Sequence, residues 1–306
     1  NELEIKDLNN GKYEVKMKIK NEGKYLISLQ CNGVDSNTSP VQIQVLSKSK
    51  QRNYCEIKEP KLTLGHVSSF GITVDSNGNI YASGGRQVQI FDSEGDAISS
   101  FGSYGEENGQ FRGAWGIAVN SKGNIIVSDY SDNKIQIFDS QGNFISKFGS
   151  KGKGNGQFNE PKGICVDLND RIYVCDSKNH RIQIFDLNGK FISKFGSKGY
   201  ENGQFDDPTG ITINSCGNII VCDVGHHRIQ IFDSERNFIS KFRSKGEGKG
   251  LYYLPEGICV DSNDNILVCD YANHRIQIFD SNGKYVNKFD VDKPRTVAID
   301  FKTQDI

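Results

Sequence analysis

Long apolar runs are missing from this sequence of 306 residues, and no stretch of about 18 apolar residues is available to form a membrane-spanning helix. No secretory signal opens the chain. Charge of one sign is also scarce, because the formal net charge is −1. This balance excludes a globally basic nucleic-acid binder, although it leaves a local basic patch open. The first residue is Asn1 rather than Met, so we expect a fragment of a longer protein.

Cysteine spacing of the zinc type is absent as well. The eight cysteines include no Cys-x-x-Cys pair, which argues against a structural zinc site. Cys175 recurs as Cys222 and Cys269, and an earlier copy of this position holds Ser128, so the position requires a small side chain. Free thiols indicate a reducing compartment, and we expect a cytoplasmic protein. Two cross-strand bridges are conceivable, but Ala or Thr replaces one member in sister copies; the pairs are Cys165–Cys175 and Cys259–Cys269.

Helical periodicity is also lacking, and in its place one pattern returns every 47 residues. Its third copy begins with Gly-Gln-Phe-Asn-Glu-Pro-Lys-Gly-Ile-Cys-Val-Asp at Gly156 and ends with Phe-Ile-Ser-Lys-Phe at Phe195. A fixed period in the forties is typical of repeat architectures. Further copies contain Gly109, Gly203 and Pro255, and a more divergent first copy contains Phe70.

Each copy contains four short runs with the alternation of half-buried strands. In the third copy the runs are 163–167, 172–176, 182–186 and 191–195. Asn-Gly, Lys-Gly and Glu-Gly pairs join successive runs, and tight hairpins of this kind need residues with positive φ. Four antiparallel strands per unit, repeated around a ring, form the blades of a β-propeller. The predicted fold class is therefore all-β.

Both ends of the repeat region carry single strands without a blade of their own. Lys61–Leu64 stands where the other copies have their fourth strand, and Pro294–Asp300 resembles a first strand. We therefore predict a six-bladed-type propeller over residues 61–306, with five full blades and a partial sixth that takes strands from both ends. Such closure removes free sheet edges. The missing strands either lie beyond Ile306 or leave the ring gapped.

Residues 1–47 lie outside the repeat and contain about four alternating strands. This is half of a β-sandwich. The pattern of Gly11-x-Tyr-x-Val, Gly23-x-Tyr-x-Ile-x-Leu, Asn32-Gly and Ser39-Pro-x-x-Ile-x-Val resembles the C-terminal half of a filamin-type immunoglobulin-like domain. The polar residues 48–60 are expected to be a linker.

The repeats resemble the NHL family through Gly-Gln-Phe-x-x-Pro-x-Gly-Ile-x-Val-Asp, Val-x-Asp and Asn-His-Arg-Ile-Gln-Ile-Phe, over about residues 61–300. A filamin-like domain followed by NHL repeats is similar to the tail of tripartite-motif ubiquitin ligases. That resemblance implies upstream RING, B-box and coiled-coil modules, and the cysteine–histidine pattern of a RING or B-box is absent from this chain. It also implies that one face of the propeller binds a protein or an RNA.

That face should collect the loops between blades and the loops between second and third strands. The four inter-blade loops, 102–114, 149–162, 196–209 and 243–256, carry formal charges that sum to zero. RNA binding needs several uncompensated phosphate contacts, so a broad basic face is not evident. A local basic patch is the candidate that stays open, and its residues are Lys151, Lys153, Lys162 and Lys178.

Residues that recur in every copy favour a structural role, whereas a ligand-binding group should break the repeat. Recurring charged residues are expected to form structural ion pairs or hydrogen bonds between blades; the pairs are Asp176–Arg181, Asp223–Arg228 and Asp270–Arg275. Trp115 breaks the repeat, since it is the only tryptophan and replaces Lys, Thr and Glu of the sister copies. At the mouth of the channel it would stack on a base, pack on a peptide or simply fill a gap. Further candidates on the face are His180, His227, His274 and Tyr253.

No enzyme is expected within this chain. Some NHL-like propellers are enzymes that hold a metal with histidines, but equivalent histidines on different blades lie too far apart for ligands about 2.3 Å from one zinc ion. No Ser-His-Asp or phosphate-loop signature is present, so neither catalytic residues, a metal nor a cofactor are predicted.

Two functions follow as hypotheses. The first is a protein-interaction platform that recruits a partner or a ubiquitination substrate. The second is binding of single-stranded or stem-loop RNA by the same face, with control of messages as the consequence. Neither DNA nor a membrane is expected as a partner. Steep salt dependence would indicate RNA.

Overall fold

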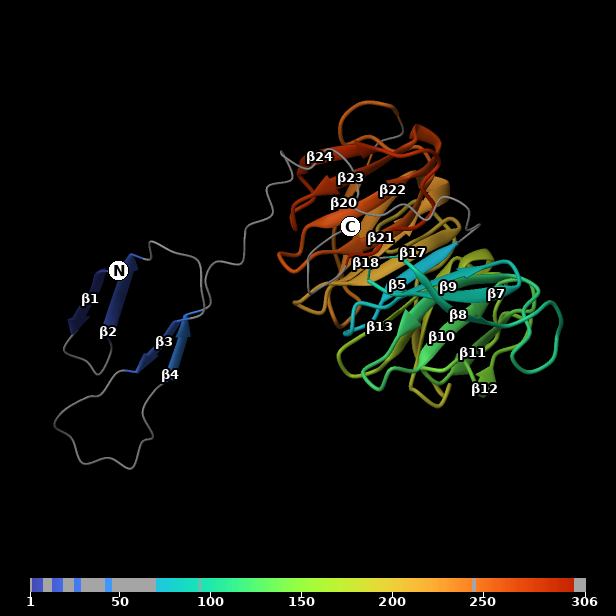
Figure 1. Cartoon of the computed structure of the whole chain (residues 1–306). Helices are drawn as coiled ribbons and strands as arrows, with labels where there is room; N and C mark the ends of the chain where they lie inside the picture. The colour runs from blue at the N-terminus through green and yellow to red at the C-terminus, as the bar shows by residue number, and fades with distance from the viewer. Residues whose placement is uncertain are drawn as a thin grey trace. The chain divides into compact units, whose positions relative to one another are not determined.

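The computed structural model describes residues 70–93, 95–243 and 246–299, except the side chain of Arg243, together with the backbone of four strands near the N-terminus (Figure 1). The chain divides into two compact units, Asn1–Asn53 and Tyr54–Ile306. In the first unit two antiparallel pairs form, and they are β1 (Glu2–Asp7) with β2 (Tyr13–Lys18) and β3 (Tyr25–Ser28) with β4 (Gln42–Val45).

The second unit contains five antiparallel four-stranded sheets among the described residues, which confirms the predicted all-β propeller. In each sheet the strands follow one another in sequence order, so every blade is a meander. The blades are β5–β8 (Gly71–Val74, Ile80–Gly84, Gln87–Phe91, Ala97–Phe101), β9–β12 (Ala114–Val119, Ile125–Asp129, Lys134–Phe138, Phe144–Phe148), β13–β16 (Pro161–Val166, Ile172–Asp176, Arg181–Phe185, Phe191–Phe195), β17–β20 (Pro208–Ile213, Ile219–Asp223, Arg228–Phe232, Phe238–Arg243) and β21–β24 (Pro255–Val260, Ile266–Asp270, Arg275–Phe279, Tyr285–Asp290).

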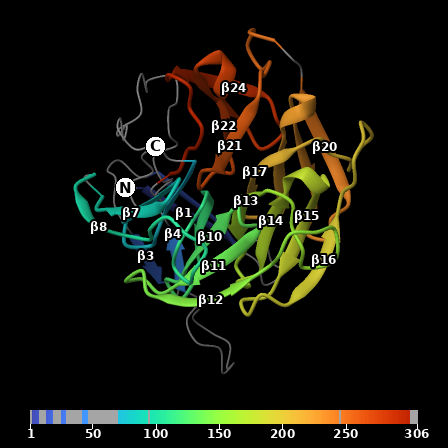
Figure 2. The same cartoon turned by 90° about the vertical axis from the view of Figure 1, so that its right-hand side faces the viewer.

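The blades stand around a common axis, with first strands inside and fourth strands outside (Figure 2). First strands of successive blades contact each other, as β9, β13, β17 and β21 do in turn. Second strands carry unbroken buried runs, because both of their faces lie against neighbouring blades. Fourth strands alternate between half-buried and exposed residues, since only one of their faces meets the protein.

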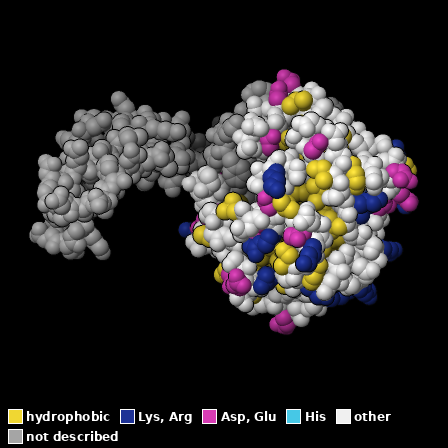
Figure 3. Space-filling model, turned by 90° about the horizontal axis from the view of Figure 1, so that it is seen from below, with side chains coloured by type: hydrophobic (Ala, Val, Ile, Leu, Met, Phe, Trp, Pro, Cys, Tyr) yellow, Lys and Arg dark blue, Asp and Glu magenta, His cyan; other side chains and the backbone are white. Residues whose placement is uncertain are grey.

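Those outer strands expose one aliphatic side chain each, and β12, β16, β20 and β24 also carry a Lys residue. Viewed from the side on which β12 lies in Figure 1, the surface shows hydrophobic patches bordered by Lys and Arg (Figure 3). Charged neighbours on an edge strand oppose sheet-to-sheet aggregation. The exposed aliphatic residues are Ile98, Ile145, Ile192, Ile239 and Val286.

The strand predicted at Pro294–Asp300 is corrected in part by the structure. Residues 294–299 belong to no strand, because they join no described sheet. Val297 and Ile299 nevertheless bury their side chains against the fifth blade, as a first strand of a sixth blade would. Three predicted parts lie outside the described residues, and they are Asp300, the run Lys61–Leu64 and the linker expected at 48–60.

Each first strand contains a glycine near its start because neighbouring blades approach very closely there. A side-chain carbon on Gly163 would collide with the carbonyl oxygen of Thr209, and one on Gly210 with that of Glu256. A side-chain carbon on Gly257 would lie only 2.5 Å from the carbonyl oxygen of Arg295. The recurring Gly of the repeat is thus explained by blade spacing.

Replacing Gly210 with Ala should therefore lower the free energy of unfolding by about 3 kcal/mol, because backbone on both sides must move. Urea unfolding of the whole chain measures this. Gly154→Ala is the control, since its added carbon meets only the flexible side chain of Gln157. Equal unfolding midpoints for the two variants would contradict the explanation.

Contacts between blades also explain why Ser128 and its sister positions carry a small side chain. Ser128 Oγ accepts a hydrogen bond from Gly116 N–H at 2.8 Å and donates to the carbonyl of Lys162 in the next blade. Cys175, Cys222 and Cys269 fill the equivalent space as free, fully buried thiols. Burial raises the pKa of each of these thiols well above its ordinary value, so they are poor nucleophiles.

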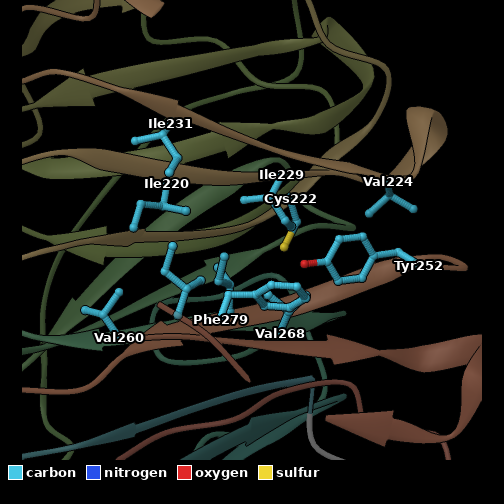
Figure 4. Packing of buried hydrophobic residues seen from close by; sticks show 11 residues of the cluster. Ile220, Cys222, Val224, Ile229, Ile231, Tyr252, Val260, Val268 and Phe279 are labelled. Carbon is cyan, nitrogen blue, oxygen red and sulfur yellow. The ribbon is translucent and has the colours of Figure 1, made fainter. Parts of the chain in front are cut away.

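One aromatic position carries a hydroxyl without a partner. In three copies a fully buried phenylalanine fills the junction between blades, as Phe111, Phe158 and Phe205 do. The fourth copy of this position is Tyr252. Its hydroxyl points toward the sulfur of Cys222 (Figure 4) and makes no hydrogen bond within the described part of the chain. Burial raises the pKa of this phenol well above its ordinary value.

Tyr252→Phe should therefore raise the free energy of unfolding by about 1 kcal/mol or more, since an unpaired buried hydroxyl is costly. Tyr173→Phe is the matched control, because the Tyr173 hydroxyl donates to Asp167 Oδ2 at 3.2 Å and its removal should destabilise. Chemical unfolding of both variants decides the matter. Destabilisation by both would show that the Tyr252 hydroxyl is satisfied.

Candidate functional site

Two kinds of loop meet on one face of the propeller. The short 3-10 turn η1 (Ser177–Asn179) follows the second strand of the third blade. Its Lys178 N–H donates to the carbonyl of Asn159, in the inter-blade loop, at 3.0 Å. Equivalent turns in the next two blades are η2 (Val224–His226) and η3 (Tyr271–Asn273). We call the surface formed by these turns and the inter-blade loops the loop face.

Buried ion pairs hold the loop face in place. Arg181 Nε donates to Asp176 Oδ2 at 2.7 Å, and Asp176 is fully buried. The remaining guanidinium nitrogens donate to the loop carbonyls of Lys153, Gly154 and Gln157. Asp223–Arg228 at 2.6 Å and Asp270–Arg275 at 2.7 Å repeat the arrangement. Each guanidinium group is fully engaged by a carboxylate and by loop carbonyls, so these arginine and aspartate residues are unavailable to a ligand.

The second blade has a different ion pair at this place. Lys134 stands where the others have Arg and donates from Nζ to the carbonyl of Glu106 at 3.1 Å. Its ion pair is with Asp132, at 3.2 Å, rather than with the buried Asp129. Burial raises the pKa of Asp129, while hydrogen bonds from the N–H groups of Arg112 and Asp132 offset part of this effect.

The recurring histidines join blades through their ring nitrogens. His180 has a left-handed backbone with φ of 53° and accepts a hydrogen bond at Nδ1 from Asp207 N–H, at 3.2 Å. His227 accepts from Leu254 N–H in the same way, and its ring stacks on Tyr253. Asn133 takes this place in the second blade, with Oδ1 accepting from Glu160 N–H at 2.9 Å.

His274 ends the series with a different partner, because its Nδ1 lies 2.6 Å from Asp292. The three candidate histidines thus face three successive blade junctions. Among the described residues no group of three or more His, Cys, Asp or Glu is arranged to hold a metal ion. The histidine positions are therefore explained by packing between blades.

The candidate lysine patch divides into two parts. Lys162 and Lys178 come together at one carboxylate, Asp207, with distances of 3.4 and 3.0 Å. Lys151 and Lys153 are exposed and have no ion pair within the described part of the chain. Of the four candidate lysines, Lys151 and Lys153 alone keep an uncompensated charge, and two charges are fewer than the several phosphate contacts that RNA binding requires.

One position on the axis does break the repeat in every copy. In five copies it is the residue whose carbonyl contacts the glycine of the preceding blade, and in the first blade it is Phe70, which precedes Gly71. Scaffold positions around it recur, whereas this position carries a different residue each time. We call the set the axial ring, and it consists of Phe70, Trp115, Lys162, Thr209, Glu256 and Arg295.

Neighbouring members of the axial ring touch almost throughout. Phe70 and Trp115 stack with ring centroids 4.5 Å apart. Lys162 places its ammonium 5.2 Å from the Trp115 ring. Thr209 Oγ1 donates to the carbonyl of Glu256 at 3.1 Å. These contacts make one continuous layer across the mouth of the channel.

Trp115 is therefore enclosed rather than open as a stacking platform. Phe70 stacks on its ring, the Lys162 ammonium lies over it, and Tyr130 meets it edge-on at 5.4 Å. A nucleobase would first have to displace one of these neighbours. Packing of a peptide around the layer needs no such change.

Glu256 and Arg295 form an ion pair within the axial ring. Arg295 Nη1 lies 3.1 Å from Glu256 Oε2, and their side chains are 33% and 16% exposed. Burial raises the pKa of Glu256, and the charges of Arg295 and Lys162 offset part of that effect. The carboxylate is therefore incompletely stabilised where it stands.

A small cavity continues from the axial ring into the channel. Its volume is about 70 Å³, whereas pockets for small-molecule ligands usually measure roughly 300–1,000 Å³. Aliphatic residues of the first strands line it, among them Ile117, Ile164 and Ile211. The head of one side chain fits there, but a typical metabolite does not.

Sequence reasoning identified Trp115 and Lys162 but missed four members of the axial ring. The signal was available for three of them, because Phe70, Thr209 and Glu256 each precede the first-strand glycine. Arg295 follows Glu256 after only 39 residues and precedes Thr296 instead of a glycine, so neither the period nor the motif marks it.

Comparisons with known protein families agree with the fold. The NHL repeat model matches residues 205–232 and 252–279, and a model described as a 6-bladed beta-propeller matches residues 117–194. Tripartite motif-containing protein 2 from Bos taurus is 33% identical over 131 residues, and the human protein is 32% identical over the same length. The match covers 41% of this chain but only 17% of those relatives.

Solved structures show similarity at the level of the fold alone. A streptogramin B lyase aligns with a TM-score of 0.57 at 16% identity, covering 78% of this chain and 75% of that one. A gluconolactonase from Xanthomonas campestris aligns with a TM-score of 0.59 at 16% identity, covering 77% and 80%. No helix in the described part of this chain is long and apolar enough to cross a bilayer.

His180 should make stability depend on pH. Burial lowers its pKa, with Lys198 and Lys178 adding to this effect and Asp206 and Asp207 opposing it. The unfolded chain then binds a proton more readily, so His180 stabilises the fold above its ordinary pKa and this stabilisation is lost as pH falls through the lower pKa of the folded state.

His180→Asn, which copies Asn133, should remove this dependence. Urea unfolding at pH 8 and pH 5.5 measures it. We expect the variant to lose less stability than the native chain at the lower pH, with His227 unchanged in both serving as an internal control. Parallel losses in the two proteins would contradict the assignment.

Proposed function

We propose that the loop face around the axial ring binds a protein partner without catalysing a reaction. The observation that carries this proposal is the contrast between a repeating scaffold and six axial positions that all differ. Trp, Tyr and Arg are the residues that most often dominate protein interfaces. The face offers Trp115 and Arg295 at the axis, and Tyr200 and Tyr253 around it.

The similarity to tripartite motif-containing protein 2 supports a broader context for this role. We propose that a larger, cytoplasmic ubiquitin ligase of the tripartite-motif type uses the propeller to recruit its substrate. The filamin-like character of residues 1–47 remains a prediction within that proposal. The axial cavity is small, and the charges of the recurring Asp–Arg pairs are neutralised within the fold. Both observations favour binding over catalysis.

RNA binding is the second candidate, and the free lysines Lys151 and Lys153 are the observation in its favour. Lys162 and Lys178 share Asp207, and Trp115 is enclosed, so the other parts of that hypothesis have less support. A nucleic acid would have to bind mainly along one inter-blade loop.

Photo-crosslinking separates the two candidates. We expect a crosslinking side chain at Asn155, on the loop face, to capture a specific protein from cell extract, whereas one at Lys122, on the opposite face, should not. Trp115→Ala should weaken capture by about tenfold or more, as expected of a residue at the centre of an interface. Tyr200→Ala gives a second test at a side chain that is 71% exposed.

Ribonuclease treatment provides the decisive control. Capture that survives ribonuclease supports the protein partner. Capture that disappears with ribonuclease, together with salt-sensitive binding of a random RNA pool that is lost in a Lys151→Glu, Lys153→Glu variant, would replace it with RNA. Equal capture from Asn155 and Lys122 would exclude the loop face.

A further inference from the structure

Arg295 shows how the axial ring accommodates a guanidinium group. Its guanidinium carbon lies 5.1 Å from the ring centroid of Phe70 and 4.5 Å from that of Tyr271. Nη2 donates to the Tyr271 hydroxyl at 3.1 Å, and Nη1 donates to Glu256. Two aromatic rings and a carboxylate, taken from the first and fifth blades, thus surround one cation.

The opposite side of the axial ring repeats this chemistry. Lys162 lies over Trp115 and reaches Asp207 Oδ1 at 3.4 Å. Aromatic faces attract cations, and the attraction grows where water is excluded. Both halves of the mouth therefore present an aromatic surface beside a carboxylate, which is an environment for positively charged groups.

Glu256 has acceptor capacity that Arg295 leaves unused. Both carboxylate oxygens contact the same nitrogen, Nη1, at 3.1 and 3.5 Å. An ionised carboxylate offers about four acceptor positions, and a second nitrogen of Arg295 is already directed to Tyr271. Glu256 also lines the axial cavity, so a further donor can approach it from the channel mouth.

Each cation of the mouth already has a carboxylate partner. Lys162 and Lys178 both pair with Asp207, and Arg295 pairs with Glu256. An acidic group from a partner would have to compete with these carboxylates. A basic group would instead add to a carboxylate that burial has left incompletely stabilised.

We propose that the protein partner inserts a basic side chain, with arginine as the best fit, into the axial mouth against Glu256. This inference rests on the proposed function and specifies its chemistry. The end of the guanidinium can enter the cavity beside Glu256 and donate its N–H groups to the free acceptor positions of the carboxylate. The cavity of about 70 Å³ admits only the end of the side chain.

Trp115, the only tryptophan of the chain, reports directly on this site. The full chain is titrated with the acetylated and amidated pentapeptide Gly-Gly-Arg-Gly-Gly while Trp115 fluorescence is followed. Matched peptides carry citrulline, which keeps the shape of arginine without its charge, or glutamate at the central position. We expect the arginine peptide to bind about tenfold more tightly than either.

Glu256→Gln should weaken binding of the arginine peptide by about tenfold and leave the citrulline peptide unaffected. Asp292→Asn is the control, because Asp292 is an exposed carboxylate on the same face, beside His274, and should not matter. Urea unfolding of Glu256→Gln checks its folding, which relief of a buried charge should preserve.

Tighter binding of the glutamate peptide would overturn the proposal, and so would arginine binding that Glu256→Gln does not change. Absence of any fluorescence response at millimolar peptide would overturn it as well. None of these results affects crosslinking from Asn155. A failure of the basic-side-chain proposal is therefore distinguishable from a failure of the protein-binding proposal itself.

Discussion

Close approach of first strands at the axis is the constraint on which the propeller depends. A carbonyl of one blade rests where the glycine of the preceding blade has no side chain, as at Gly163 with Thr209 and Gly210 with Glu256. Any side-chain carbon there would push two blades apart. The contact uses only backbone on the carbonyl side, so the side chain of that residue is free to differ. The structural constraint and the variable site thus share one position.

The loop face is held by interactions that leave the axial ring alone. Buried Asp–Arg pairs such as Asp223–Arg228 bind the inter-blade loops from below through their backbone carbonyls. Partners removed from water interact strongly, and the loss of one would leave a buried charge uncompensated. Histidines and Asn133 add bonds between adjacent blades. The result is a rigid rim around a variable centre, which is the arrangement that a selective binding surface requires.

The charged residues illustrate how far sequence reasoning reaches. The 47-residue period identified the Asp–Arg pairs as a group, and their geometry follows from register, because residues such as Asp176 and Arg181 are partners on adjacent strands. The basic patch was a weaker inference. Whether four lysines act together depends on where Asp207 points, and no local pattern encodes that. Arg295 escaped notice because its spacing and the following Thr296 depart from the repeat.

The sequence by itself determined the all-β fold, the blade as the repeating unit and the strand pattern within it, because period, alternation and turn residues are local properties. It also showed that Trp115 departs from its sister positions. Only the tertiary structure decided that six residues up to 225 positions apart, from Phe70 to Arg295, form one layer. That layer exists because the first strands lie side by side around the axis, and this arrangement is a property of the whole chain rather than of any repeat.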